Sequence, residues 1–150
     1  MTKRPDWLDL LTPLPEDAVP QWQPVAPPEI LATPEGAAVA GWQQVVIHLS
    51  APCVGLRTLL AVVDASGAVL AANDGTYERL SDDPPIVRHA SIGGRFEIDG
   101  SFRGTRWFAE GPEAPEDEPS QLESKRTEPT ADETATLRAL VDEMLRRRPR

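Results

Sequence analysis

The sixteen prolines of this chain are so unevenly placed that they limit where regular secondary structure can form. Eight fall in the first 36 residues and four in residues 112–129, whereas residues 37–109 contain only three. Proline lacks a backbone N–H and its ring fixes φ, so proline-rich segments do not form continuous strands or helices. In a chain of one domain's length, we therefore expect a Pro-rich acidic N-terminal arm (1–36), an antiparallel β core (37–109), an acidic flexible linker (110–129) and a C-terminal segment (130–150).

The negative charge of the chain lies mostly outside the expected core. The whole chain has a net charge of −9. Residues 110–133 contain nine acidic and two basic side chains, whereas residues 37–109 contain seven and six. A chain of this sign repels the phosphate backbone of nucleic acids, so we expect no nucleic-acid partner.

Several classes of site are excluded by what the sequence lacks. It has one cysteine, Cys53, so neither a disulfide framework nor a Cys-based zinc site forms within one chain. The two histidines, His48 and His89, have no metal-ligand spacing, and no P-loop or dinucleotide fingerprint is present. We therefore expect no metal, no cofactor and no catalytic residue. Because no long apolar run occurs, we also expect a cytoplasmic protein that does not bind a membrane.

The core begins with a strand pattern. Residues 42–50 alternate apolar and polar side chains and are rich in β-branched residues, which favours a strand. An alternative is a helix that Thr33 caps and Pro34 begins, running towards this segment. Gly36 and Gly41 weaken the helix, so we expect the strand.

A hairpin and a further strand follow. Residues 56–63 are a nearly continuous apolar run, residues 64–67 (DASG) form a turn, and residues 68–73 return as the partner strand. We expect a loop over residues 73–85 and another strand over 86–92. Short connections between consecutive strands imply antiparallel pairing. The expected fold is mainly β, a small antiparallel sandwich or partly open barrel of about six strands, with a C-terminal amphipathic helix and a flexible Pro-rich arm.

The stretch SIGGRFEIDGSFRGTRWF, residues 91–108, is expected to form the last hairpin. A three-residue loop at positions 98–100 pairs Phe96 with Phe102. It also places Gly100 where a type I turn followed by a bulge requires positive φ.

One face of this hairpin is the candidate binding surface. It carries several arginines, and a β-bulge near Gly104 would bring Arg106 onto that face while turning Trp107 into the interior. Guanidinium groups beside an aromatic ring or a carboxylate bind anionic ligands or a partner's acidic segment. The alternative is a solvated face on which Glu97 pairs with the arginines, each pair contributing about 0.2–1 kcal/mol. The candidate ligand-binding or partner-binding residues are His89, Arg95, Arg103, Arg106 and Trp107.

The N-terminal arm contains a candidate docking segment, DWLDLL (6–11). Large apolar side chains among acidic ones are typical of a peptide that folds into a partner's groove. The alternative is that the arm packs on its own core. The candidate docking residues are Trp7, Leu8, Leu10 and Leu11.

The C-terminal segment predicts an amphipathic helix. Thr130 and Glu133 fit a capping box, and arginines at 146–148 suit the negative end of the helix dipole. A helix of about 17 residues is marginal alone in water, so its apolar stripe must be buried on its own core, on a second copy or on a partner. The stripe consists of Leu137, Leu140, Val141, Met144 and Leu145.

These features predict a non-catalytic protein–protein interaction module, an adaptor or assembly subunit. Its arm and C-terminal helix would dock onto another protein or a second copy of itself. One alternative is a small ligand-binding domain or enzyme that uses the His/Arg patch of the last hairpin. Another is a self-assembling structural protein.

Overall fold

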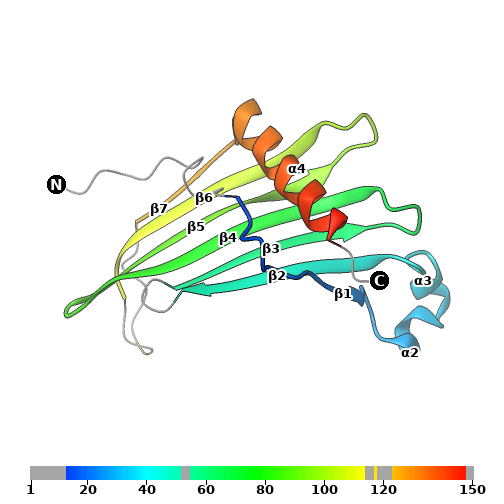
Figure 1. Ribbon diagram of the computed structural model, residues 1–150, viewed down its shortest axis with the longest axis horizontal. Coiled ribbons are helices and arrows are strands. Elements are labelled where there is room, and N and C mark those ends of the chain that lie inside the picture. Colours follow the sequence, from blue (N-terminus) through cyan, green and yellow to red (C-terminus); the bar gives the residue numbers. More distant parts are fainter. Residues whose placement is uncertain (1–12, 52–54, 114–116, 118–122, 148–150) are drawn as a thin grey trace.

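The computed structural model describes residues 13–51, 55–113, 117 and 123–147. Within these residues, seven antiparallel strands form one open sheet whose strand order follows the chain, and helix α4 crosses one face of the sheet (Figure 1). The predicted mainly β fold with consecutive antiparallel strands and a C-terminal helix is confirmed, and α4 provides the layer that a second sheet provides in a sandwich. The strands are β1 (Gln21–Pro24), β2 (Gln43–Ala51), β3 (Gly55–Val63), β4 (Val69–Asp82), β5 (Pro85–Phe96), β6 (Phe102–Pro112) and β7 (Glu123–Thr127), and the helices are α2 (Pro28–Leu31), α3 (Pro34–Ala37) and α4 (Ala131–Arg146).

The first long strands confirm the predicted hairpin. The apolar run 56–63 lies in β3, and the chain returns as β4 after the DASG turn. Asp64 closes this turn, because its carboxylate accepts hydrogen bonds from the backbone N–H groups of Ser66 (2.8 Å) and Ala68 (3.0 Å). Gly67 takes a φ of 91°, which a residue without a Cβ adopts freely.

The helix start signal at Thr33 is confirmed, but the helix that follows is short. Thr33 Oγ1 accepts a hydrogen bond from the Gly36 N–H (3.0 Å), and Pro34 occupies the first helical position. The helix ends at Ala37, and Gly41, with a φ of 84°, lies at the entry to β2. The strand expected after it is therefore correct, and the alternative of a long helix is wrong.

Most of segment 73–85 lies in β4, so the predicted loop is wrong. Asp74, a residue typical of turns, is buried, and its carboxylate accepts two hydrogen bonds from the Arg57 guanidinium on β3 (3.0 and 2.7 Å). Burial raises the pKa of Asp74, and the Arg57 charge opposes this rise. Glu78 and Arg88 form another cross-strand ion pair, between β4 and β5. Partners on neighbouring strands hold these polar residues in strand conformation.

The three-residue loop predicted for the last hairpin is confirmed. Phe96 of β5 pairs with Phe102 of β6, their ring centroids are 4.9 Å apart, and Gly100 takes a φ of 88°. The bulge predicted near Gly104 is absent, because β5 and β6 pair residue for residue along the whole of their shared length. Neighbouring side chains of β6 therefore alternate between the two faces without interruption.

The sheet takes its two edge strands from outside the predicted core. β1 comes from the arm predicted over residues 1–36, and β7 comes from the linker predicted over residues 110–129. Both strands are short, and they carry proline, lysine or arginine, which discourage further pairing at a sheet edge. Parts of these two acidic segments are therefore built into the sheet.

Helix α4 packs its apolar stripe on its own sheet. The predicted capping box is present: Thr130 Oγ1 accepts a hydrogen bond from the Glu133 N–H (3.2 Å), and Glu133 Oε1 accepts one from the Thr130 N–H (3.0 Å). Each large apolar side chain buried here contributes about 1.5–3 kcal/mol. The stripe residues packed in the core are Leu137, Leu140, Val141 and Met144, with Leu145 partly buried beside them.

Residues 13–20 lie on the same face of the sheet as α4 (Figure 1). Leu14 joins the core, and the Arg147 guanidinium at the end of α4 donates hydrogen bonds to the backbone carbonyls of Pro15 and Ala18. This part of the arm therefore packs on its own core. The predicted docking residues Trp7, Leu8, Leu10 and Leu11 lie outside the described residues.

Candidate functional site

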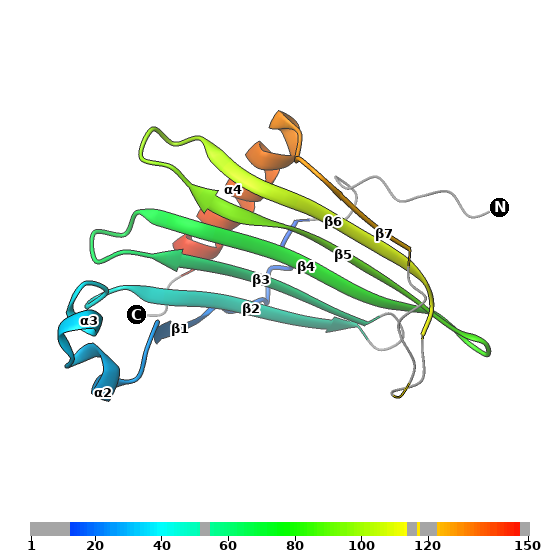
Figure 2. The same cartoon turned by 180° about the vertical axis from the view of Figure 1, so that it is seen from behind.

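The two faces of the sheet differ in what covers them. Side chains alternate between faces along a strand, so the register assigns each residue to one face. The helix face carries α4 and residues 13–20, whereas no described helix or strand lies over the middle of the opposite face (Figure 2). We call this opposite face the open face. Leu60, Asn73, Ser91 and Trp107 are on it.

The open face carries an apolar patch on β2 to β4, with polar side chains at other positions of the same strands. Val46, Leu60, Val62 and Ala71 are neighbours there by register, with Val46 buried and the other three half-buried. Leu56, farther along β3, is 59% exposed. The solvated face of an antiparallel sheet is usually polar. An apolar area in this position is therefore typical of a surface that binds another molecule.

Three aromatic rings cross the open face from β4 to β6. The ring centroids of Tyr77 and His89 are 4.6 Å apart in an edge-to-face arrangement, and those of His89 and Trp107 are 5.8 Å apart. Burial lowers the pKa of His89, and the Glu113 carboxylate opposes this shift. The imidazole is therefore mainly neutral at neutral pH, and the row as a whole is an uncharged aromatic surface.

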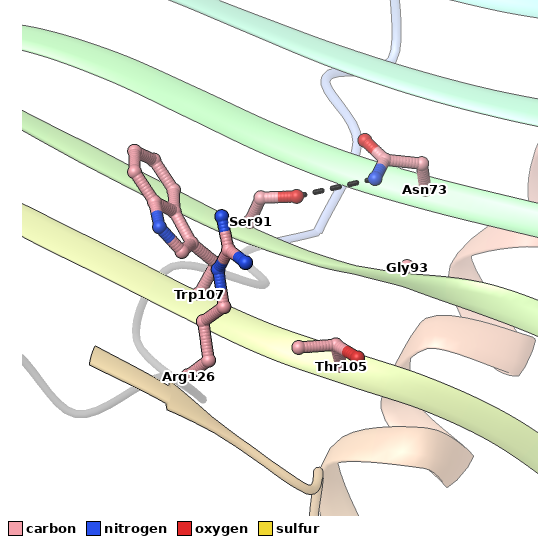
Figure 3. A pocket seen from close by; sticks show the side chains of 6 residues that line it. All are labelled: Asn73, Ser91, Gly93, Thr105, Trp107 and Arg126. Carbon is pink, nitrogen blue, oxygen red and sulfur yellow. Dashed lines mark hydrogen bonds between the residues drawn. The ribbon is translucent and has the colours of Figure 1, made fainter. Parts of the chain in front are cut away.

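A hollow of about 460 Å³ lies in the open face beside the indole of Trp107 (Figure 3). Gly93 leaves room for the Asn73 side chain, because a Cβ on this glycine would lie 2.3 Å from Asn73 Nδ2. The same Nδ2 donates a hydrogen bond to Ser91 Oγ (3.1 Å). The residues that line the hollow come from β4 to β7: Asn73, Ser91, Gly93, Thr105, Trp107 and Arg126.

The charged groups around the hollow are mainly cationic. Arg126 of β7 is the cross-strand neighbour of Trp107, and Arg95 pairs with Arg103 one row beyond the hollow. Glu97 lies 3.4 Å from the Arg103 guanidinium and offsets its charge. In the part of the chain that the structure describes, the exposed side chains of Arg95 and Arg126 form no ion pair. Their guanidinium groups are therefore available to an anion.

Four of the five predicted patch residues share the open face, namely His89, Arg95, Arg103 and Trp107. Arg106 lies on the helix face, where its guanidinium donates hydrogen bonds to Glu133 Oε1 (2.7 Å) and Thr127 Oγ1 (2.8 Å). The predicted positions of Arg106 beside the other arginines and of Trp107 in the interior are both wrong, because the bulge that would have placed them there is absent. Arg106 instead joins the start of α4 to β6.

Sequence reasoning missed five residues of the hollow, namely Asn73, Ser91, Gly93, Thr105 and Arg126. The sequence did indicate the positions of Ser91 and Thr105. Each is two positions from a predicted patch residue on its own strand, so it lies on the same face as that residue. Asn73 lay at the start of a predicted loop, and Arg126 lay in a predicted linker. Asn73 was also the last residue of the predicted strand 68–73, but no face was assigned to either residue.

No group of three or more His, Cys, Asp and Glu side chains within the described residues could hold a metal ion. His48 Nδ1 lies 3.2 Å from Thr58 Oγ1, at hydrogen-bond distance. Cys53 lies outside the described residues. In the same described part of the chain, no helix has the length and apolar character needed to cross a membrane.

Comparison of the chain with protein-family models, with curated proteins and with solved structures finds no match. A function can therefore be inferred only from the molecule's own surface. The open face, with its apolar area, its aromatic row and its cationic hollow, is the most distinctive part of that surface.

Proposed function

We propose that this protein is a non-catalytic protein–protein interaction module, an adaptor or a subunit of an assembly, which binds its partner on the open face. One observation supports this proposal above the others. A sheet face with half-buried apolar and aromatic side chains has no second layer in the described chain. On the helix face, α4 covers the comparable surface. A partner protein would cover the open face in the same way.

The size of the open face suits stable docking. Strands β2 to β6 are each at least nine residues long. At about 3.3 Å per residue and about 4.8 Å between strands, they present a face of roughly 24 by 30 Å. This area of roughly 700 Å² is close to the roughly 800 Å² that each partner buries in a standard interface.

The charges of the open face favour a different protein over a second copy. A two-fold symmetric dimer uses the same surface on both copies. Pairing about an axis that passes near the hollow would thus bring Arg95, Arg103 and Arg126 close to the same cationic groups of the second copy. Like charges across an interface are repulsive. The proposed partner is therefore another protein with an acidic surface.

Docking through α4 or through the N-terminal arm stays a prediction. The stripe of α4 is buried on its own sheet, so partner binding through Leu137 or Met144 requires the helix to leave the sheet. The open face binds a partner without any such rearrangement. For this reason the proposal centres on the open face.

The test compares two substitutions of exposed apolar residues. Leu56→Glu places an acidic charge beside Tyr77 on the open face, and Ile30→Glu, at a residue 50% exposed on α2, is the matched control. Immobilised wild type and both variants are used to enrich proteins from an extract of the source cells. The enriched protein is then purified, and its Kd is measured by calorimetry. We expect about a tenfold weaker Kd for Leu56→Glu and no change for Ile30→Glu.

Two results would overturn the proposal. One is that wild type and Leu56→Glu retain the same proteins with the same affinity. The other is that light scattering shows a dimer of wild type that Leu56→Glu dissociates, which would identify the partner as a second copy. Circular dichroism of each variant confirms that folding is preserved.

A further inference from the structure

We infer that the hollow beside Trp107 recognises a carboxylate, the side chain of a glutamate or aspartate in an acidic segment of the partner. This inference deepens the proposed function and depends on it. It rests on one juxtaposition: an exposed arginine, two hydroxyl groups, a side-chain amide and an indole line one hollow, and none of the described residues that line it is acidic.

The hydrogen-bonding groups of the hollow match a carboxylate. The Arg126 guanidinium presents N–H donors in a planar fork, the geometry that binds both oxygens of a carboxylate. The Ser91 and Thr105 hydroxyl groups can donate to an oxygen that approaches from above. All these groups come from adjacent strands whose register holds them in place (Figure 3).

The shape of the hollow also favours a side chain that carries its charge on an apolar stem. On β5 and β6, the Gly93–Thr105 pair lies between the Ser91–Trp107 pair and a pair of arginines. Because Gly93 has no side chain, the Asn73 amide lies over it in this middle row and forms part of the lining of the hollow. The Trp107 indole forms an apolar wall beside it, against which the methylene groups of a glutamate can pack.

The charge distribution directs an acidic partner to this site. The chain has a net charge of −9, so most of its surface repels an acidic protein. Around the hollow, Arg95 and Arg126 form no ion pair within the described residues, whereas Arg103 is paired with Glu97. Complementary charges of this kind determine which surfaces meet and in what orientation.

The test uses two neighbouring cations on β7. Arg126 is on the open face, and Lys125 pairs with Phe108, one position away, on the helix face. Arg126→Gln and Lys125→Gln therefore change the net charge equally on opposite faces of the same strand. The probe is the peptide acetyl-Glu-Glu-Phe-Glu-Glu-Glu-amide, and its control is the same peptide with glutamine for glutamate. Binding is measured by calorimetry and by ¹⁵N NMR shifts.

We expect the glutamate peptide to bind the wild type and to shift the amide signals of Gly93 and Thr105. Arg126→Gln should weaken its binding about tenfold, the loss of one charge-assisted hydrogen-bonded contact, whereas Lys125→Gln leaves it unchanged. Equal binding of the glutamine peptide, or equal losses in the two variants, would overturn the inference. Tighter binding of a single-stranded oligothymidine would also overturn it, since the site would then bind nucleic acid.

The two proposals fail in distinguishable ways. If partner binding is lost in Leu56→Glu but is unchanged in Arg126→Gln, the open face binds a partner and the carboxylate site is wrong. If Leu56→Glu and Ile30→Glu bind the partner equally, docking on the open face is wrong, whatever the peptide does.

Discussion

The helix face and the open face alternate residue by residue along the same strands, yet their charged groups behave differently. On the helix face, Asp74 is buried with Arg57, and Glu133, only 2% exposed, is paired with Arg106. On the open face, Arg95 and Arg126 are exposed and form no ion pair in the described part of the chain. Buried charges need partners, whereas exposed ones do not. The comparison shows that described segments of the chain cover the helix face, whereas none of them covers the middle of the open face.

The largest expected effect comes from breaking a charge pair on the helix face. Arg57→Leu leaves the Asp74 carboxylate buried without its guanidinium, which should lower the free energy of unfolding by about 3–5 kcal/mol at pH 7. Arg79→Leu, which breaks an exposed pair with Glu113, should cost less than about 1 kcal/mol. Urea denaturation measures both. Similar losses in the two variants would contradict the difference between buried and exposed pairs.

The pH dependence of Arg57→Leu sharpens this prediction. Burial raises the pKa of Asp74, so the folded state binds this proton more tightly than the unfolded state does. The stability linked to this group is therefore lost as pH rises through its folded-state pKa and regained as pH falls. Removing Arg57 raises that pKa further. The difference in the free energy of unfolding between wild type and Arg57→Leu should therefore become smaller as the pH is lowered from 7 to 5.

The second-largest expected effect is a difference in stability loss between two adjacent leucines of β3 that lie on opposite faces of the sheet. Leu59 is buried under the helix layer, whereas Leu60 is half-buried on the open face. Leu59→Ala should cost about 2–5 kcal/mol, because it leaves a cavity in the core. Leu60→Ala should cost about 1 kcal/mol, the ordinary loss for a partly exposed site. If thermal and urea denaturation show equal losses, the open face is as tightly packed as the core.

The smallest expected effect is a difference in stability loss between two arginines of β6. Arg106→Gln removes the charge-assisted hydrogen bond that joins the buried Glu133 to the sheet. This loss should lower the free energy of unfolding by about 1.5–3 kcal/mol. Arg103→Gln, on the exposed open face, should cost less than about 0.5 kcal/mol. Hydrogen exchange is an independent readout: the amides of α4 should exchange faster in Arg106→Gln, with those of β3 little changed. Unaltered exchange in α4 would show that Arg106 does not hold the helix.

The features that the sequence predicted correctly are local. The DASG turn, the loop at 98–100 and the capping box of Thr130 and Glu133 each depend on residues within a few positions of one another. The apolar stripe of α4 follows from the period of one helix. Such features form in the same way wherever the segment lies in the fold, so they are visible before the fold is known.

The features that the sequence did not predict depend on distant partners. Asp74 reads as a turn residue until Arg57, on another strand, provides its counter-charge. β1 and β7 read as arm and linker, because a short edge strand is stabilised by its neighbour more than by its own composition. The hollow was not predicted for the same reason, because Arg126 lies beside Trp107 only when β6 pairs with β7. The candidate site was therefore found only in part.

The strand order of the sheet has a consequence for biosynthesis. Each strand pairs with the one made just before it, so the sheet can grow by successive hairpins as the chain leaves the ribosome. Helix α4, which covers the helix face, is made after all seven strands. Until α4 has been made, the nascent chain exposes apolar side chains on both faces of the sheet, and such surfaces are prone to aggregation.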